Sequence, residues 1–287
     1  MDSVVNTGVG LLADVSTLIL ASLGLAVVFG LMRVINFAHG AFIMAGAFTT
    51  VTLVREGMSF WIAIPAAALV GVILGIVVER TLIRPLYGRR TLDTLLATFG
   101  LSLVMYQLAV NIFGTAPPGI SAPLGKITVG RFGIPHYTLV LIVATVLIVA
   151  ATWLLFTRTR YGVLARAAIQ SPDMAAALGV DSKRMNLLTF MLGCGLAGLA
   201  GGIIAPTVSV DPTLGDSYLA STFLSVVVAG PAFLTGLLGS GVMLGGVDSS
   251  VARLATAFWG QAALLVVAIV ALRVRTGGLS ASWRRDL

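Results

Sequence analysis

The sequence has few charged residues and long uncharged runs. Only 10% of its 287 residues are charged, whereas 58% are apolar. A soluble domain carries about 25% charged residues, so this deficit excludes a water-facing surface of such size. The apolar residues form runs about as long as the roughly 20 residues that a helix needs to cross a bilayer. The sequence therefore predicts an all-α, polytopic integral membrane protein in contact with a lipid bilayer.

Residues for covalent or metal chemistry are also scarce. Cys194 is the only cysteine, so it can form neither an intrachain disulfide nor a cysteine-based metal site. The two histidines, His39 and His136, belong to distant parts of the sequence and are expected near opposite faces. No nucleophile–base pair or metal-ligand cluster is visible. The sequence therefore predicts neither an enzyme nor a metal protein.

A site for ATP is missing as well. A phosphate-binding P-loop requires the pattern GxxxxGK[ST], and the chain has only two lysines, Lys126 and Lys183. The nearest match, from Gly119 to Lys126, has one residue too many between its glycines and continues with Ile127. We therefore expect no cofactor on this chain, and no ATP bound through this motif.

Acidic residues are absent from the middle of the expected spans. Asp14, Glu79 and Asp93 lie near span ends. Carriers coupled to protons or sodium usually place ionisable groups at mid-depth, although carbonyl oxygens alone can hold Na⁺. A stand-alone secondary transporter or channel is therefore the weaker alternative to a transport subunit that takes its energy elsewhere.

Basic residues give the chain a formal net charge of +7. They fall in connecting segments, as the positive-inside rule predicts, rather than on one soluble face that could bind nucleic acid. Segments 80–90 and 157–184 and the C-terminal tail hold most of them and are expected to be cytoplasmic. Segments 114–136 and 206–217 are poor in basic residues and are expected outside.

Eight apolar segments are expected to lie in the membrane. The one at 218–246 carries Gly230-Pro231 at its middle, where proline removes a helical hydrogen bond. A cytoplasmic tail and an external segment 206–217 require an odd number of crossings between them. The span 252–272 supplies one crossing, so segment 218–246 must return to the side from which it came. It is therefore either re-entrant or two short crossings. The other expected spans are 9–32, 36–54, 61–79, 93–113, 137–156, 186–206 and 252–272.

Small residues recur at four-residue spacing in several spans. Such pairs let helices approach closely in lipid. They predict a tightly packed bundle and say nothing about a solute. The pairs are Gly71 and Gly75, Gly198 and Gly202, and Gly241 and Gly245.

Two polar groups in the spans are candidates for a translocation path. The junction from Arg33 to Gly40 holds Asn36 and His39 in an apolar setting, where polar groups are costly unless hydrogen-bonded. Thr94, Thr98 and Ser102 recur every four residues and share one helical face. Both groups could instead serve helix capping or hydrogen bonding between helices, and the residues alone leave these alternatives open.

The long basic segment 157–184 is predicted to be structured. Ser171 suits an N-cap, Pro172 the first helical position and Asp173 the positive end of a helix. A short helix over 172–178 should end at Gly179. This segment could dock a soluble partner, or it could be a solvated connecting helix.

Several motifs together resemble the permease subunits of branched-chain amino-acid ABC importers. The similarity runs in order from about residue 18 to 275, and the set is specific where each piece alone is not. The stretches that carry it are Gly24–Gly40 with Met44–Ala47, Arg84–Leu86 before Leu95–Ser102, Ala175–Val180 and Phe190–Gly202.

The resemblance implies a single permease domain over residues 1–287, with about eight helices, in the bacterial inner membrane. It implies a second, related permease, two cytoplasmic ATPase subunits that use ATP and Mg²⁺, and an external solute-binding protein. Within the loop Asp173–Gly179, it assigns the contact with the ATPase to the residues Asp173, Ala175, Ala176, Ala177 and Gly179. The transported solute would be a branched-chain or related amino acid.

Two departures from the family pattern concern function. Ala41 stands where the family usually has an acidic residue after His39-Gly40, and Ala229–Gly236 replaces a stretch close to Gly-Gly-x-Gly. Leu92–Leu96 and Val210–Gly215 also resemble the branch that transports urea and short amides. The sequence does not decide between these two branches.

Overall fold

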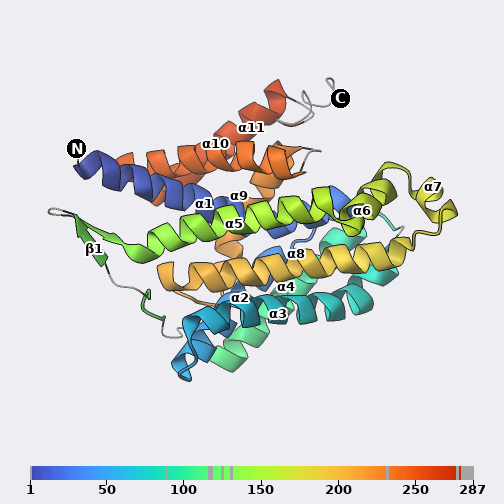
Figure 1. The fold of residues 1–287 in the computed structure, drawn as a ribbon, viewed down its shortest axis with the longest axis horizontal. Coiled ribbons are helices and arrows are strands. Elements are labelled where there is room, and N and C mark those ends of the chain that lie inside the picture. The colour runs from blue at the N-terminus through green and yellow to red at the C-terminus, as the bar shows by residue number, and fades with distance from the viewer. Residues whose placement is uncertain are drawn as a thin grey trace.

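The computed structural model describes residues 2–87, 89–115, 119–123, 126–129, 132–230, 233–275 and 278. Its helices form a bundle with one short β-hairpin outside it (Figure 1). The elements are α1 Asp2–Met32, α2 His39–Arg55, α3 Phe60–Val78, the π-helical turn η1 Glu79–Ile83, the 3-10 turn η2 Arg84–Leu86, α4 Thr91–Phe113, β1 Lys126–Val129, β2 Phe132–Pro135, α5 His136–Arg158, α6 Arg160–Gln170, α7 Pro172–Ala177, α8 Ser182–Ile204, the 3-10 turn η3 Ala205–Thr207, α9 Leu214–Ala229, α10 Phe233–Leu254 and α11 Ala257–Val274.

This architecture confirms the predicted helical membrane class. Within the described residues, six helices are long and apolar enough to cross a bilayer: α1, α3 with its two following turns, α4, α5, α8 and α11. The helix α9 is apolar but shorter. The helices α2 and α10 stand outside this set, so the expected number of eight spans is not established by length and apolarity.

The bundle has two distinct ends, which we name by their extra elements. The α7 end carries α6 and α7, and the hairpin end carries β1, β2 and the N-terminus of α1 (Figure 1). The strands pair antiparallel, with Lys126 opposite Pro135 and Val129 opposite Phe132. The turns η1 and η2, which belong to the basic segment 80–90, lie toward the α7 end.

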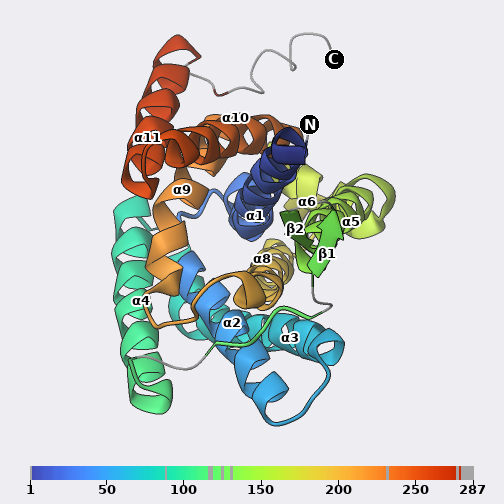
Figure 2. The same cartoon turned by 90° about the vertical axis from the view of Figure 1, so that its left-hand side faces the viewer.

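Helix α8 is the core of the bundle and packs on its neighbours through glycines (Figure 2). A Cβ added at Gly198 would lie 2.5 Å from the carbonyl oxygen of Ala67 in α3, and one added at Gly46 in α2 would overlap the Gly198 carbonyl. Cβ atoms at Gly71 and Gly75 would meet Cys194, which is buried. The close approach predicted from the glycine spacing is confirmed.

Replacing Gly198 with leucine is expected to destabilise the bundle strongly. The added side chain would meet backbone atoms of Ala67 and Gly71 in α3, and overpacking a core costs about 1–3 kcal/mol or more. Thermal unfolding of the purified protein in detergent measures this effect. Gly100→Leu is the matched control, because a Cβ at Gly100 finds no atom within 4 Å. Equal losses of thermal stability in both variants would contradict this account of the packing.

The segment expected to be broken consists of two helices. Helix α9 ends at Ala229, Gly230 has a φ of +78°, and α10 begins at Phe233. Pro231 lies outside the described residues. The positive φ at Gly230 suits a residue without a Cβ and ends α9 at this point.

Helix α10 runs antiparallel to α1, which settles where the segment goes. Gly241 lies against Ile19, Gly245 against Val15, and Arg253 contacts Asp14 near the start of α1. The helix pair α9–α10 therefore enters the bundle and returns to the hairpin end. A segment that enters and leaves at the same end makes an even number of crossings. Both predicted alternatives, a re-entrant segment and two short crossings, have this property.

Candidate functional site

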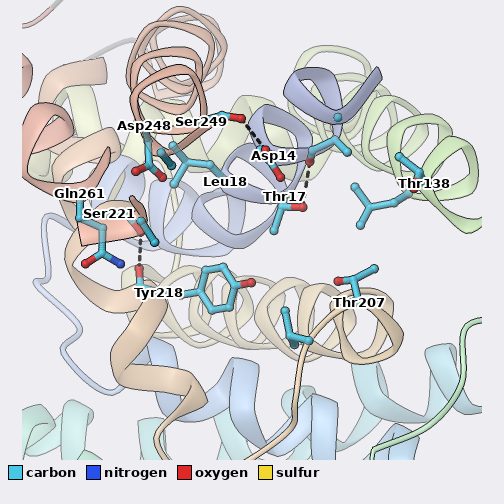
Figure 3. A pocket seen from close by; sticks show the side chains of 16 residues that line it. Asp14, Thr17, Leu18, Thr138, Thr207, Tyr218, Ser221, Asp248, Ser249 and Gln261 are labelled. Carbon is cyan, nitrogen blue, oxygen red and sulfur yellow. Dashed lines mark hydrogen bonds between the residues drawn. The ribbon is translucent and has the colours of Figure 1, made fainter. Parts of the chain in front are cut away.

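A polar cavity of about 500 Å³ opens at the hairpin end of the bundle (Figure 3). It is lined by α1, α5, α9, α10, α11 and the turn that follows α8. Most of its polar side chains come from α1 and from the three last helices. They are Asp14, Thr17, Thr138, Thr207, Tyr218, Ser221, Asp248, Ser249 and Gln261.

Asp14 on the wall of this cavity is held by two residues of α10. The Nη2 atom of Arg253 donates to Asp14 Oδ2 at 2.6 Å, and the Ser249 hydroxyl donates to the same oxygen. Arg253 Nε also donates to Ser249 Oγ at 3.2 Å. Arg253 is absent from the lining, so this cation neutralises Asp14 from behind the wall.

Asp248 differs from Asp14, because it has no hydrogen bond or ion pair to another described residue. It lines the first cavity and also a neighbouring cavity of about 680 Å³. Tyr218, Ser221 and Gln261 line both as well. Neither lining contains a lysine, arginine or histidine among the described residues. The two linings together hold the carboxyl groups of Asp14, Asp211, Asp216 and Asp248, and only Asp14 has an ion pair among the described residues. This end of the bundle therefore favours cations and N–H donors.

Three of the five path candidates from the two polar groups, Asn36, His39 and Thr98, lie together, away from this cavity. The backbone N–H of Phe37 donates to Thr98 Oγ1 at 3.1 Å, which joins the chain before α2 to α4. Asn36 Oδ1 accepts from the N–H of Ala38, and the backbone N–H of His39 donates to the Asn36 carbonyl. These contacts hold a non-helical stretch in place, as Asn and Thr do at helix starts.

His39 joins α2 to α1. Its side chain is 1% exposed, and Nε2 donates to the carbonyl oxygen of Ala21 at 2.8 Å. The Nδ2 atom of buried Asn36 has no partner among the described residues. The observed contacts of both side chains are hydrogen bonds within the fold. A role for either residue in the translocation path stays a prediction.

The other members of the Thr94 stripe are separated. Thr94 is buried and lines a cleft at the α7 end, together with Arg33 and Lys183. Ser102 donates back to the Phe99 carbonyl at 2.7 Å and is partly exposed. The stripe therefore does not form one continuous polar wall.

The predicted coupling segment forms a short helix at the α7 end. Helix α7 spans Pro172–Ala177, and Gly179 follows with a φ of +84°. Ser171 stands at the N-cap position, but its side chain makes no capping hydrogen bond. Ala175 is buried, whereas Asp173, Ala176 and Ala177 are exposed.

Helix α7 and its C-terminal turn also present apolar side chains to the outside. Met174 is 62% exposed and Leu178 is 79% exposed. They are four residues apart, so they lie on the same side of the helix. An exposed apolar pair on a structured segment is typical of a contact surface.

Two tyrosines at the α7 end act as neutral hydrogen-bond partners. Burial, reinforced by the hydrogen bond to Glu79, raises the pKa of Tyr87 above its usual range, and the hydroxyl donates to Glu79 Oε1 at 2.9 Å. Burial also raises the pKa of Tyr161, whose hydroxyl lies 2.8 Å from Thr189 Oγ1. Both tyrosines therefore stay protonated at neutral pH and fix the turns beside the helices.

Among the described residues, no three His, Cys, Asp or Glu side chains gather as a metal site would require. The prediction that this chain binds no cofactor itself stays a prediction.

The sequence did not reveal the cavity residues Asp248, Tyr218 and Gln261. A signal existed in Asp248 and Arg253, which stand between two apolar segments with Asp14 in a third.

A family model described as "Branched-chain amino acid transport system / permease component" matches residues 8–272. The chain belongs to this permease family. Its resemblance to the family was visible in the sequence and is confirmed.

Curated relatives agree with the family match. The permease is 26% identical to a probable branched-chain amino acid transport permease protein (LivH) of Methanocaldococcus jannaschii, over 93% of this chain and 90% of the relative. It is 29% identical to a high-affinity branched-chain amino acid transport system permease protein (BraD) of Pseudomonas aeruginosa, over 80% of each. A guanosine ABC transporter permease protein (NupQ) of Bacillus subtilis is 26% identical over 57% of this chain and 46% of the relative. No solved structure matches.

Proposed function

We propose that this permease is the membrane-spanning subunit of an ATP-driven importer for branched-chain or related amino acids. The family and the named relatives support the class of the solute. The chain carries no P-loop pattern, so the energy would come from partner ATPase subunits that bind ATP and Mg²⁺.

The arrangement of the two ends carries this proposal. A polar cavity with a free carboxylate opens at the hairpin end, and a structured segment with exposed Met174 and Leu178 lies at the α7 end. An importer needs both features, a solute entrance on one side and a contact for the ATPase on the other. The hairpin end would face outside, where an external binding protein delivers the solute.

The remaining assignments follow from this orientation. The α7 end, with the basic segments 80–90 and 157–184, would face the cytoplasm, and so would the C-terminus. A second, related permease would cover part of the exposed apolar helices. The assembly would lie in the bacterial plasma membrane, with two ATPases below it.

The cavity chemistry fits a solute with an ammonium group. Asp248 has no cation among the described residues, and Asp14 is already neutralised by Arg253. An amino acid would bring its own cation to Asp248, while its carboxylate would find the hydroxyl of Tyr218 and the amide of Gln261. Urea and guanosine also offer N–H donors but no cation, so they make weaker partners for a free carboxylate.

Reconstitution of the complete assembly tests the proposal. Proteoliposomes with both permeases, the ATPases and the binding protein should accumulate leucine only when ATP is present inside the vesicles, on the side of the ATPases. Acetamide, urea and guanosine serve as the competing solutes. Leucine transport by this chain alone, driven by an ion gradient, would overturn the proposal in favour of a secondary transporter.

A further inference from the structure

A second cleft, at the α7 end, is lined by basic residues from separate elements. One part has a volume of about 390 Å³ and the other about 250 Å³, and both are lined by Met32, Arg33, Ser182 and Asn186. The larger part adds Arg89, Lys183 and the phenol of Tyr87. The end of α1, the turn after η2 and the start of α8 thus meet around one hollow.

The side chains of the three cations in this cleft have no anionic partner among the described residues. The charged nitrogens of Arg33, Arg89 and Lys183 have no carboxylate oxygen within 4.0 Å there. The carboxylate of Asp181 accepts from the backbone N–H of Lys183 at 2.9 Å, as the N-cap of α8, and makes no ion pair with the ammonium group. The carboxyl group of nearby Glu79 is buried and accepts from Tyr87. Neither part of the cleft is lined by an aspartate or glutamate. Like charges brought together without a counter-ion repel each other, so the cleft attracts an anion.

Arg33 lines this cleft in a strained backbone conformation. Its φ of +54° makes it the only described residue other than glycine with a positive φ. Its backbone N–H donates to the Phe29 carbonyl at 3.0 Å and closes the C-terminus of α1. Glycine or asparagine normally fills this left-handed position, and strained residues of this kind cluster at functional sites. The strain places a guanidinium at the mouth of the cleft instead.

The position of the cleft indicates where its anion comes from. All three cations stand at the ends of membrane helices or in the turn between two of them, so they lie at the depth of lipid headgroups. Basic pockets between membrane helices on the cytoplasmic side bind anionic headgroups. We propose that this cleft binds the phosphate headgroup of an anionic phospholipid, beside the α6–α8 segment.

Binding of short-chain phosphatidylglycerol to the full-length permease in detergent tests the site. The wild type should bind it at one saturable site and at least tenfold more tightly than phosphatidylcholine. The double variant Arg89→Gln/Lys183→Gln should bind it about thirtyfold more weakly, which corresponds to about 1 kcal/mol for each removed basic residue. Native mass spectrometry gives both the stoichiometry and the lipid preference.

A matched double variant separates the site from general surface charge. Arg80→Gln/Arg184→Gln removes the same charge from two exposed residues of the same segments, and neither residue lines the cleft. This control should keep the affinity of the wild type within about twofold. Equal weakening in both double variants would overturn the proposal, because it would show diffuse attraction to the basic end.

Two further outcomes concern the source of the anion. If inorganic phosphate displaces the lipid at equal concentration, the cleft binds a free anion, and the proposal of a lipid site is overturned. A cleft variant that binds phosphatidylglycerol normally but loses affinity for the ATPase would assign the cleft to an acidic protein surface, and would also overturn it. Failure of these tests leaves the proposed transport function untouched, since no step of that proposal uses the cleft.

Discussion

Replacing Ala176 with proline is expected to abolish the coupling between ATP hydrolysis and transport. Helix α7 has six residues, and proline in its interior removes a backbone hydrogen bond and costs about 3 kcal/mol or more. So short a helix cannot absorb that loss, so Met174 and Leu178 would lose their common face. Solute-stimulated ATP hydrolysis in the reconstituted assembly should fall at least tenfold, to the basal rate.

Two controls make this result specific to α7. Ala176→Ser changes the same exposed position and keeps the helix, so it should preserve stimulation. The proline variant should still insert and unfold at the temperature of the wild type, because Ala175 is the one buried residue within 173–179. Unchanged stimulation in Ala176→Pro would contradict a docking role for α7.

Leu178→Asp tests the same surface without breaking the helix. Leu178 is 79% exposed, so a charge there should leave the fold intact while it disfavours an apolar contact. We expect weaker association of the ATPase with the permease and partial loss of stimulation. Co-purification of the two subunits measures the association.

The sequence predicted the bundle well because lipid allows few backbone solutions. The runs at 9–32, 93–113 and 137–156 correspond closely to α1, α4 and α5, since each backbone group must be paired inside a helix. The four-residue glycine spacing predicted contacts that the structure shows at Gly198 and Gly241. The short helix after Ser171 was also predicted, because cap, proline and glycine signals are local.

Elements that depend on distant contacts were not predicted. Helix α6 and the hairpin β1–β2 have no apolar run, so the span pattern gives no sign of them. The segment broken at Gly230-Pro231 was expected to end at about residue 246, and the next span to begin at about residue 252. The structure continues α10 to Leu254, where Arg253 and Ser249 contact Asp14 of α1.

The candidate site depended most on the tertiary structure. The sequence singled out Asn36 and His39 as polar residues in apolar runs, and the structure gives both of them hydrogen bonds inside the fold. The polar cavity instead combines Asp14 with Asp248 and Gln261, which come from opposite ends of the sequence. No local pattern joins residues so distant, and only the antiparallel pairing of α1 with α10 brings them together.

Replacing Asp248 with asparagine is expected to weaken the binding of amino acids to the permease about 10- to 100-fold. The substitution keeps the shape of the side chain and removes the free carboxylate that lines both cavities. A hydrogen bond to a charged group contributes about 1.5–3 kcal/mol, and each 1.4 kcal/mol changes affinity tenfold. Equilibrium dialysis of leucine against the permease–ATPase assembly, without the binding protein, measures the change.

The carboxylate of Asp248 can act on the solute or only on the fold, and two comparisons separate these roles. Glu56→Gln removes an equal charge from an exposed residue near the end of α2, outside both cavity linings, and should leave leucine affinity unchanged.

The second comparison uses 4-methylpentanoate, which is leucine without its ammonium group. The wild type should bind leucine much more tightly than 4-methylpentanoate. Asp248→Asn should lose most of that preference, because it removes the carboxylate that contacts the ammonium group of leucine. A variant that binds both solutes more weakly by the same factor would show that Asp248 shapes the cavity without recognising the cation. The preference ratio, rather than the loss of binding, is therefore the quantity that decides whether this cavity selects amino acids by their ammonium group.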